Sequence, residues 1–203
     1  MRLLHLIPLA MMCSVLVACA SAAAPPESDL YAPYRPALLA AYQKDLDNLP
    51  PISRYNLDLK VDFDTRHVEG QGTVQIPNRH AIPLTELYFR LFPNLPQYQG
   101  TMVVNQIFVD GKMTAFDITA DNTSLHILLP EPLSPDHTAA ISYTWTVNAP
   151  SLTTGYALFG EGQGILSLPL SYPIVAVSEV GTTGQRLNWR LDVAPAHGDV
   201  AFT

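Results

Sequence analysis

Histidines are the first residues of this sequence to consider for chemistry, because a catalytic zinc takes three protein ligands and leaves one position open. Beyond the first few residues the histidines are His67, His80, His126, His137 and His197. No two of them are separated by the three to five residues that place two ligands on one helical face, and the pattern H-E-x-x-H is absent. We therefore predict no metal site and no cofactor in this chain. A site assembled from distant residues remains an alternative.

Hydrolase residue types occur together once, at Ser134, Asp136 and His137. Three such residues next to Pro135 are more typical of a polar turn than of a catalytic triad, and the pattern G-x-S-x-G is absent. The glycine-rich stretch GEGQG at 160–164 precedes the strand-like ILSLPL and not a helix, which favours a hairpin turn over a phosphate-binding loop. We predict no catalytic residue, with a hydrolase of unrecognised site as a further alternative.

The amino-terminal segment 1–18 predicts a signal peptide. One basic residue is followed by an apolar run over 3–17, which is shorter than the roughly 20 residues of a membrane span. The next stretch, LVAC at 16–19, resembles the bacterial lipobox, so we expect Cys19 to carry lipid and to hold an exported protein at a membrane of the cell envelope. Alternatively, the small residues at 20–22 form an ordinary cleavage site and the protein is secreted.

Composition and charge limit the other classes of function. Cys13 would leave with the signal peptide and Cys19 would be lipidated, so we expect no disulfide. Hydrophobic residues make up 48% of the sequence, which is enough for a substantial core. The net charge is −7 and the basic residues are scattered singly, so we expect no nucleic-acid partner.

The elements after Cys19 begin with a tether and one helix. Residues 19–35 are small, proline-bearing and polar, as in a linker. Residues 36–48 predict a short helix that begins at Pro36 and ends before two prolines. Four apolar residues share one helical face: Leu38, Leu39, Tyr42 and Leu46. A helix this short is marginal by itself, so we expect this face to pack against another surface.

From 54 to 203 the hydrophobic period changes to two, which indicates β-strands. Segments 55–63 and 68–76 predict a hairpin, and Gly70 and Gly72 indicate a bulge or a close backbone approach. Asp110-Gly111 predicts a tight turn. Further strands are predicted at 84–91, 103–109, 125–129, 139–147, 164–168, 174–177 and 187–193. Short strands separated by turns favour an all-β fold, an antiparallel β-sandwich or curled sheet.

The stretch LYFRLFPN at 87–94 contains an arginine in an otherwise apolar strand that ends at a turn. We expect Arg90 to lie on the solvent face or the rim of the sheet, with its stem over apolar neighbours and its guanidinium in water. Its apolar neighbours should face the core or a surface for a partner domain.

Several segments taken in order resemble the N-terminal β domain of aminopeptidase-N-like zinc metallopeptidases, the gluzincin aminopeptidases. The resemblance spans about 55–199 and depends on the succession of its motifs. The segments are RYNLDLKVDFDTRHVEGQGTVQIPN, LTELYFRLFPNLPQYQGTMVVNQIFVDG, SLHILLPEPLSP, AISYTWTVNAP and LSYPIVAV.

That resemblance implies a non-catalytic domain that supports a separate catalytic domain and forms one wall of its substrate cleft. The catalytic domain of such relatives carries H-E-x-x-H, a distant glutamate and G-x-M-E-N, and we expect zinc only there. The apolar end at 200–203 is typical of an interrupted strand, so we expect a truncated domain with an exposed apolar surface for its partner. The alternative is a stand-alone envelope module that binds a peptide, a glycan or a partner protein.

Overall fold

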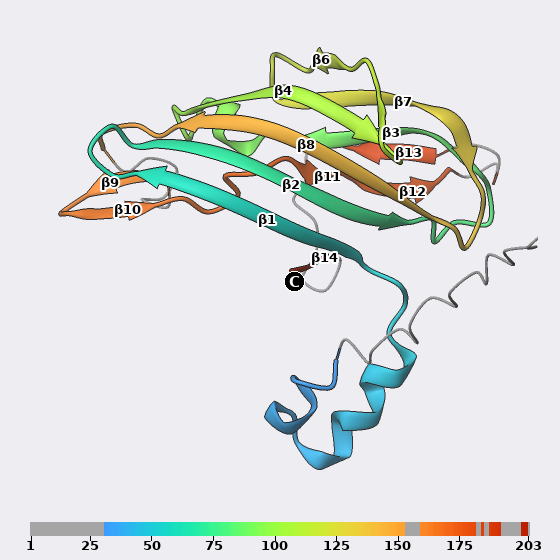
Figure 1. Cartoon of the computed structure of the whole chain (residues 1–203). Coiled ribbons are helices and arrows are strands. Elements are labelled where there is room, and N and C mark those ends of the chain that lie inside the picture. Colours follow the sequence, from blue (N-terminus) through green and yellow to red (C-terminus); the bar gives the residue numbers. More distant parts are fainter. Residues whose placement is uncertain (1–30, 153–158, 182–183, 185–186, 192–199, 203) are drawn as a thin grey trace, which may run out of the picture. The chain divides into compact units, whose positions relative to one another are not determined.

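The computed structural model describes residues 31–152, 159–181, 184, 187–191 and 200–202. The chain divides into two compact units, 1–49 and 50–203 (Figure 1). The predicted signal peptide at 1–18 and Cys19 lie outside the described residues. Among the described residues, no helix has both the length and the apolar character needed to cross a bilayer.

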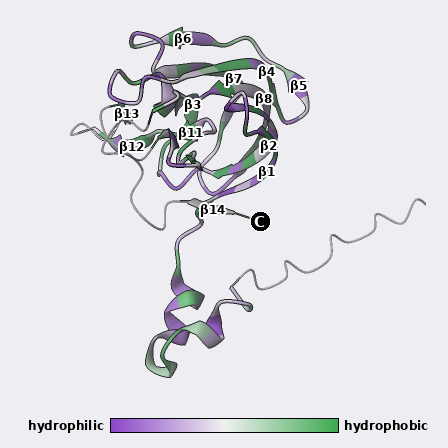
Figure 2. Ribbon diagram, turned by 90° about the vertical axis from the view of Figure 1, so that its left-hand side faces the viewer, coloured by the Kyte–Doolittle hydropathy of each residue, from purple (hydrophilic) through white to green (hydrophobic). Residues whose placement is uncertain are grey.

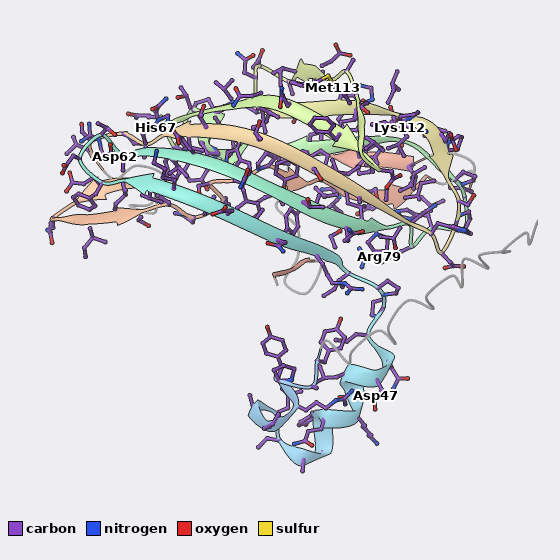
Figure 3. All side chains as sticks on the ribbon, in the orientation of Figure 1. Asp47, Asp62, His67, Arg79, Lys112 and Met113 are labelled. Carbon is purple, nitrogen blue, oxygen red and sulfur yellow. The ribbon has the colours of Figure 1, made fainter. Side chains whose placement is uncertain are left out.

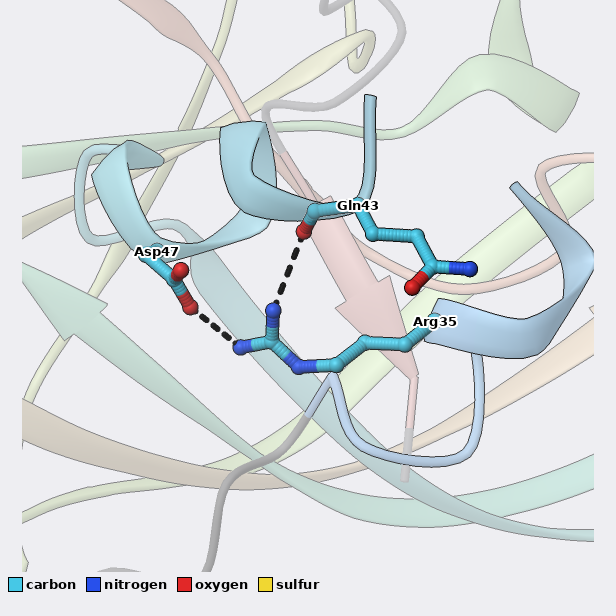
Figure 4. Close-up of polar contacts among 3 residues, drawn as sticks. All are labelled: Arg35, Gln43 and Asp47. Carbon is cyan, nitrogen blue, oxygen red and sulfur yellow. Dashed lines mark hydrogen bonds and ion pairs between the residues drawn. The ribbon is translucent and has the colours of Figure 1, made fainter. Parts of the chain in front are cut away.

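The described part of the first unit consists of two 3₁₀ helices, η1 (Arg35–Ala37) and η2 (Ala40–Asn48). The helix predicted over 36–48 is therefore interrupted, because Leu38 and Leu39 have extended backbones with ψ of 149° and 140°. The Arg35 guanidinium joins the two segments: it donates to the Gln43 carbonyl at 3.0 Å and pairs with the Asp47 carboxylate (Figure 4). No residue of either helix is buried.

The second unit contains a large sheet whose strand order is β14-β1-β2-β8-β4-β5 (Figure 1). Its strands are β1 (Ser53–Asp62), β2 (His67–Pro77), β4 (Thr101–Val109), β5 (Lys112–Met113), β8 (Thr138–Asn148) and β14 (Val200–Phe202). Every pairing in it is antiparallel except that of β1 with β14. The predicted hairpin of 55–63 with 68–76 is confirmed as β1–β2, with Tyr55 opposite Val74.

A smaller antiparallel sheet has the order β11-β3-β7-β6, and two hairpins complete the unit. The elements are β3 (Leu84–Arg90), η3 (Phe92–Asn94), β6 (Asp117–Thr119), β7 (Ser124–Leu133), β9 (Gly160–Gly162), β10 (Ile165–Ser167), β11 (Ile174–Val175), β12 (Val177–Val180) and β13 (Leu187–Arg190). The predicted all-β antiparallel fold is confirmed. So are the turns: Asp110-Gly111 joins β4 to β5, and GEGQG forms the β9–β10 hairpin.

The core lies between the inner faces of the two sheets. Side chains of β2 and β8 from the large sheet and of β3 and β7 from the small sheet form one buried cluster. Across the interface, the rings of Phe89 and Tyr143 meet edge to face with centroids 6.0 Å apart. Hydrophilic and hydrophobic residues both occur along these strands, as Figure 2 shows. This alternation leaves one face of each sheet for the core, as in other β-sandwiches.

At the centre of the large sheet, the backbone of β2 lies against the ring of a buried tryptophan. A Cβ atom added at Gly70 would lie 2.3 Å from Cε2 and Cζ2 of Trp145, which is 1% exposed and sits opposite Gly70 on β8. The register of β2 with both neighbouring strands is continuous, so the glycines mark a close approach and not a bulge. Position 70 therefore has no room for a side chain, because the Trp145 indole ring occupies that space.

Arg90 corrects the expectation of a solvent-facing guanidinium, because the residue is only 3% exposed. Its strand β3 lies between β11 and β7, where Arg90 pairs with Ile174 on one side and Ser124 on the other. Its guanidinium carbon lies 5.1 Å from the centroid of the Phe92 ring. The aromatic face offers a partial replacement for water, which is how a cation is retained at a buried position.

The rest of LYFRLFPN belongs to the core and to a bridge between the sheets. Leu87, Phe89 and Leu91 are buried, which settles the open choice in favour of the core. The Asn94 amide Nδ2 donates to the Met102 carbonyl at 3.0 Å and to the Asn122 carbonyl at 2.7 Å. Asn94 thereby joins β4 of the large sheet to the turn that follows β6 in the small one.

Replacing Gly70 with alanine should destabilise the domain by about 1–3 kcal/mol, because the added methyl forces the Trp145 ring out of its position in a packed core. Chemical denaturation monitored by tryptophan fluorescence would measure the change. Gln75→Ala, at an exposed position of the same strand, is the matched control and should stay within about 0.5 kcal/mol of the original chain. Equal stability of both variants would contradict the close approach.

Candidate functional site

The four described histidines are held apart by separate partners. Each ring has a hydrogen-bond partner: His67 with Asn148 Oδ1, His80 with Ser178 Oγ, His126 with Glu86 Oε2, and His137 with the Pro135 carbonyl. Figure 3 labels His67 and Arg79, the neighbour of His80, at opposite ends of the large sheet. In the part of the chain that the structure describes, no three histidine, cysteine or acidic side chains are grouped to hold a metal. The arrangement does not suit zinc; His197 lies outside this part.

The Ser134, Asp136 and His137 group is the polar turn that the sequence predicts. The His137 N–H donates to the Ser134 carbonyl at 3.2 Å, and Asp136 has a left-handed backbone with φ of 61°. The His137 ring bonds to the backbone of Pro135, so it is not directed at a nucleophile. The group therefore has no triad geometry.

Among the described hollows, a small cavity beside His80 brings together a histidine, an arginine, serines and a tryptophan. It has a volume of about 60 Å³ and lies where the β2–β3 connection meets the β12–β13 hairpin. Within it His80 Nε2 lies 2.8 Å from Ser178 Oγ, although the two residues are 98 positions apart in sequence. We call this hollow the His80 cavity.

A buried asparagine positions His80. Asn78 is 1% exposed, and its Oδ1 accepts the His80 backbone N–H at 3.0 Å. Its Nδ2 donates to the carbonyls of Ile82 and Leu133, both at 2.9 Å. Each polar atom of this amide is used within the loop that follows β2 and the end of β7. His80 thus stands on a loop whose backbone is fixed from inside the domain.

Three aromatic residues of the large sheet position the other side of the cavity. The Trp145 indole donates to the Ser171 carbonyl at 2.7 Å, and the Tyr143 hydroxyl donates to the Pro173 carbonyl at 3.4 Å. The Tyr55 hydroxyl accepts the Val175 N–H at 2.8 Å. Together they hold segment 171–175, which we call the tethered segment, and it leads directly into β12 and Ser178. Burial raises the pKa of the Tyr143 hydroxyl well above its usual value, so this group keeps the proton it donates.

Trp189 forms the remaining wall. It lies opposite Ser178 in the β12–β13 hairpin, so the two side chains share one face of that hairpin. On its other side its ring meets Tyr88 at 5.7 Å, and Tyr88 in turn stacks on His126 at 4.3 Å. The Trp189 Nε1 is buried, and no acceptor for it is found among the described residues.

The polar groups that line the His80 cavity are mostly donors. The polar residues among them are Arg79, His80, Ser53, Ser178 and Trp189, and no acidic residue is found among the described residues of the lining. Burial, followed by the nearby Arg79 charge, lowers the pKa of His80, so the imidazole favours its neutral form.

A larger hollow of about 430 Å³ lies along β4 and includes Val103, Ile118 and Asp121. Asn94 and Asn122 both line it, and the Asn94 amide is committed to the bridge between the sheets. We therefore choose the His80 cavity as the candidate site for the polar residues that meet there, although the hollow along β4 is larger.

No motif in the sequence indicated the His80 cavity. His80 and Ser178 come from segments that only the fold brings together, and Trp189 reaches them through strand pairing. The one local signal is the pair Arg79-His80, three residues after the end of the strand predicted over 68–76.

No protein-family model matches the chain, and no curated protein matches it. Among solved structures it is similar to an M1 zinc metallopeptidase from Deinococcus radiodurans, with 22% identity over 50% of this chain and 21% of that one, at a TM-score of 0.40. A two-domain M1 zinc metallopeptidase bound to L-arginine has 21% identity to it over 52% of this chain and 22% of that one, at a TM-score of 0.40. Native yeast LTA4 hydrolase has 19% identity to it over 46% of this chain and 14% of that one, at a TM-score of 0.34. The chain spans about a fifth of the length of the first of these.

His80 should make the folded state less stable in acid. The unfolded chain binds a proton at this residue near pH 6.5, whereas the folded chain resists protonation until a lower pH, because the pKa of His80 is lowered on folding. Stability is therefore lost as the pH falls from 6.5 through the folded-state pKa. His80→Gln should lose less stability than the original chain between about pH 7.5 and about pH 5, measured by urea denaturation.

His137→Gln is the control for this pH dependence, because that ring lies in an exposed turn. It should follow the original chain at both pH values. If His80→Gln showed the same acid sensitivity as this control, burial of the His80 ring would not be what makes it difficult to protonate.

Proposed function

We propose that this chain is an exported, non-catalytic β domain of the kind found at the N-terminus of aminopeptidase-N-like zinc metallopeptidases. It would support a catalytic domain and form one wall of the substrate cleft, without hydrolysing peptides alone. The ordered succession of motifs along 55–199 supports this assignment. The all-β sandwich is compatible with it, since such a domain supplies a rigid surface.

The observation that carries the support role is an uncovered stretch on β1. Tyr55 is fully buried, and alternate residues of β1 lie on the same face as Tyr55. Further along that face, Leu59 is 42% exposed and Val61 48%, and Phe63 in the following turn is 48% exposed. The second half of this face thus lacks the cover that the first half has. Apolar side chains in a row on one strand are a surface suited to burial against a partner domain.

Hydrolysis would then require residues that the partner domain contributes. The purified chain should therefore release no product from aminoacyl or peptide p-nitroanilides, with or without added zinc. An active zinc aminopeptidase under the same conditions is the positive control. Turnover that a chelator abolishes would contradict the non-catalytic role. The coding DNA downstream of Thr203 provides an independent test, because a support domain predicts an H-E-x-x-H sequence there.

We further propose that the protein is anchored by lipid on Cys19 and works at a membrane surface of the cell envelope. The LVAC stretch directly behind an apolar run supports this placement. Cells fed labelled fatty acid should incorporate label into the original chain and none into Cys19→Ser. Equal labelling of the two would contradict lipid attachment at this residue, and Cys13→Ser is the matched control because that residue precedes the expected cleavage point.

A further inference from the structure

We propose that β1 pairs with β1 of a second copy of this chain, so that the two large sheets join into one. The pairing is antiparallel, covers residues 56–62, and places Leu59 of each copy opposite Leu59 of the other. This inference does not rest on the proposed support role. Strand pairing uses the edge of β1, whereas a partner domain would cover its apolar face.

The far half of β1 has a described neighbouring strand on one side only. On that side β2 pairs with residues 54–62 of β1. On the other side the described strand β14 pairs with residues 53–55 (Figure 1). We call the backbone of residues 56–62 on the side away from β2 the open edge. Backbone N–H and C=O groups along such an edge are a template for another strand.

The charges on the solvent face of the open edge are complementary to themselves. When two copies pair about Leu59, Asp58 of each copy lies opposite Lys60 of the other, which gives two ion pairs across the symmetry axis. Asn56 lies opposite Asp62, so no like charges meet at these positions. Opposite charges directly across two antiparallel strands stabilise their pairing. The Lys60 side chain is 80% exposed although it contacts Glu69 at 3.2 Å, and it remains accessible to a second strand.

Other registers of the same two edges are disfavoured. A shift of two residues in one direction places Asp58 opposite Asp58 of the other copy, and a shift in the opposite direction places Lys60 opposite Lys60. A shift of one residue places apolar side chains opposite polar ones. The register about Leu59 avoids all three conflicts. It also begins at residue 56, directly after the residues that β14 occupies.

The apolar face of β1 favours the same register. Leu59 is 42% exposed and Val61 is 48% exposed. In the paired strands Leu59 meets Leu59 of the other copy, and Val61 lies opposite Leu57, on the same face. Each contact removes apolar area from water and adds to the free energy of association. One register therefore joins both the charged face and the apolar face of this strand.

Introduced cysteines test the register in the full chain, with its two native cysteines replaced by serine. Leu59→Cys should form a disulfide-linked dimer under oxidising conditions. Directly opposite residues of antiparallel strands have Cα atoms about 4.5–5.5 Å apart, a separation that a disulfide can span. Val61→Cys alone should not be linked, because the two positions 61 would lie about 13 Å apart. A mixture of Val61→Cys with Leu57→Cys should be linked.

Met113→Cys is the matched control for cross-linking, because Met113 is 67% exposed on β5, at the other edge of the same sheet (Figure 3). It should remain a monomer on a non-reducing gel. If Leu59→Cys were linked no more than this control, the proposal would be overturned. Linkage of Val61→Cys alone as strong as that of Leu59→Cys would overturn the register.

Exchange of charges tests the ion pairs. Lys60→Glu and Asp58→Lys each place like charges opposite each other, and each should weaken the dimer roughly tenfold in sedimentation equilibrium. An equimolar mixture of the two variants should recover the association, because the two lysines of one then face the two carboxylates of the other. Lys112→Glu makes the same change of charge on β5 and should leave the dimer unchanged. An original chain that stays monomeric at every concentration, or a mixture that associates no better than its components, would contradict the pairing.

Discussion

The structure depends on how the large sheet satisfies the polar atoms of its own buried aromatic residues. Trp145, Tyr143 and Tyr55 bring an indole N–H and two hydroxyls into the core, where an unpaired polar group is costly. All three bond to the backbone of one stretch of chain, the tethered segment 171–175. That stretch enters β11, the edge strand of the small sheet. The hydrogen bonds that satisfy the buried aromatic residues therefore also attach the small sheet to the large one. Gly70 leaves the room that the Trp145 indole ring needs.

The same interactions explain why a cavity exists beside His80. The tethered segment continues directly into β12, so its attachment to the core also fixes Ser178 and, across the hairpin, Trp189. His80 approaches from the other side on a loop that the buried amide of Asn78 holds. Neither side is free to collapse onto the other. A hollow lined by donors can then persist without filling, as preorganised binding sites require.

The interior between the sheets and the far half of β1 differ in how well their apolar side chains are covered. The interior between the sheets is complete, with an arginine retained at a buried position beside an aromatic ring. The far half of β1, in contrast, has the apolar alternation of a core strand without the cover. A strand costs little to extend once its hairpin is formed, but its apolar face gains free energy only if something packs on it. The domain therefore combines a packed interior with an uncovered apolar face on β1.

The sequence by itself determined the long strands, the β1–β2 hairpin, the turn at Asp110-Gly111 and the hairpin at 160–164, since period-two alternation and turn chemistry are local properties. At Gly70 it left a bulge and a close approach open, and the structure shows the close approach. Only the tertiary structure decided that Arg90 is buried, because neighbouring strands and the Phe92 ring cover it. Likewise, the meeting of His80 with Ser178 depends on the attachment of segment 171–175, which no local pattern encodes. Local chemistry specifies elements, whereas burial and distant contacts are properties of the packed whole.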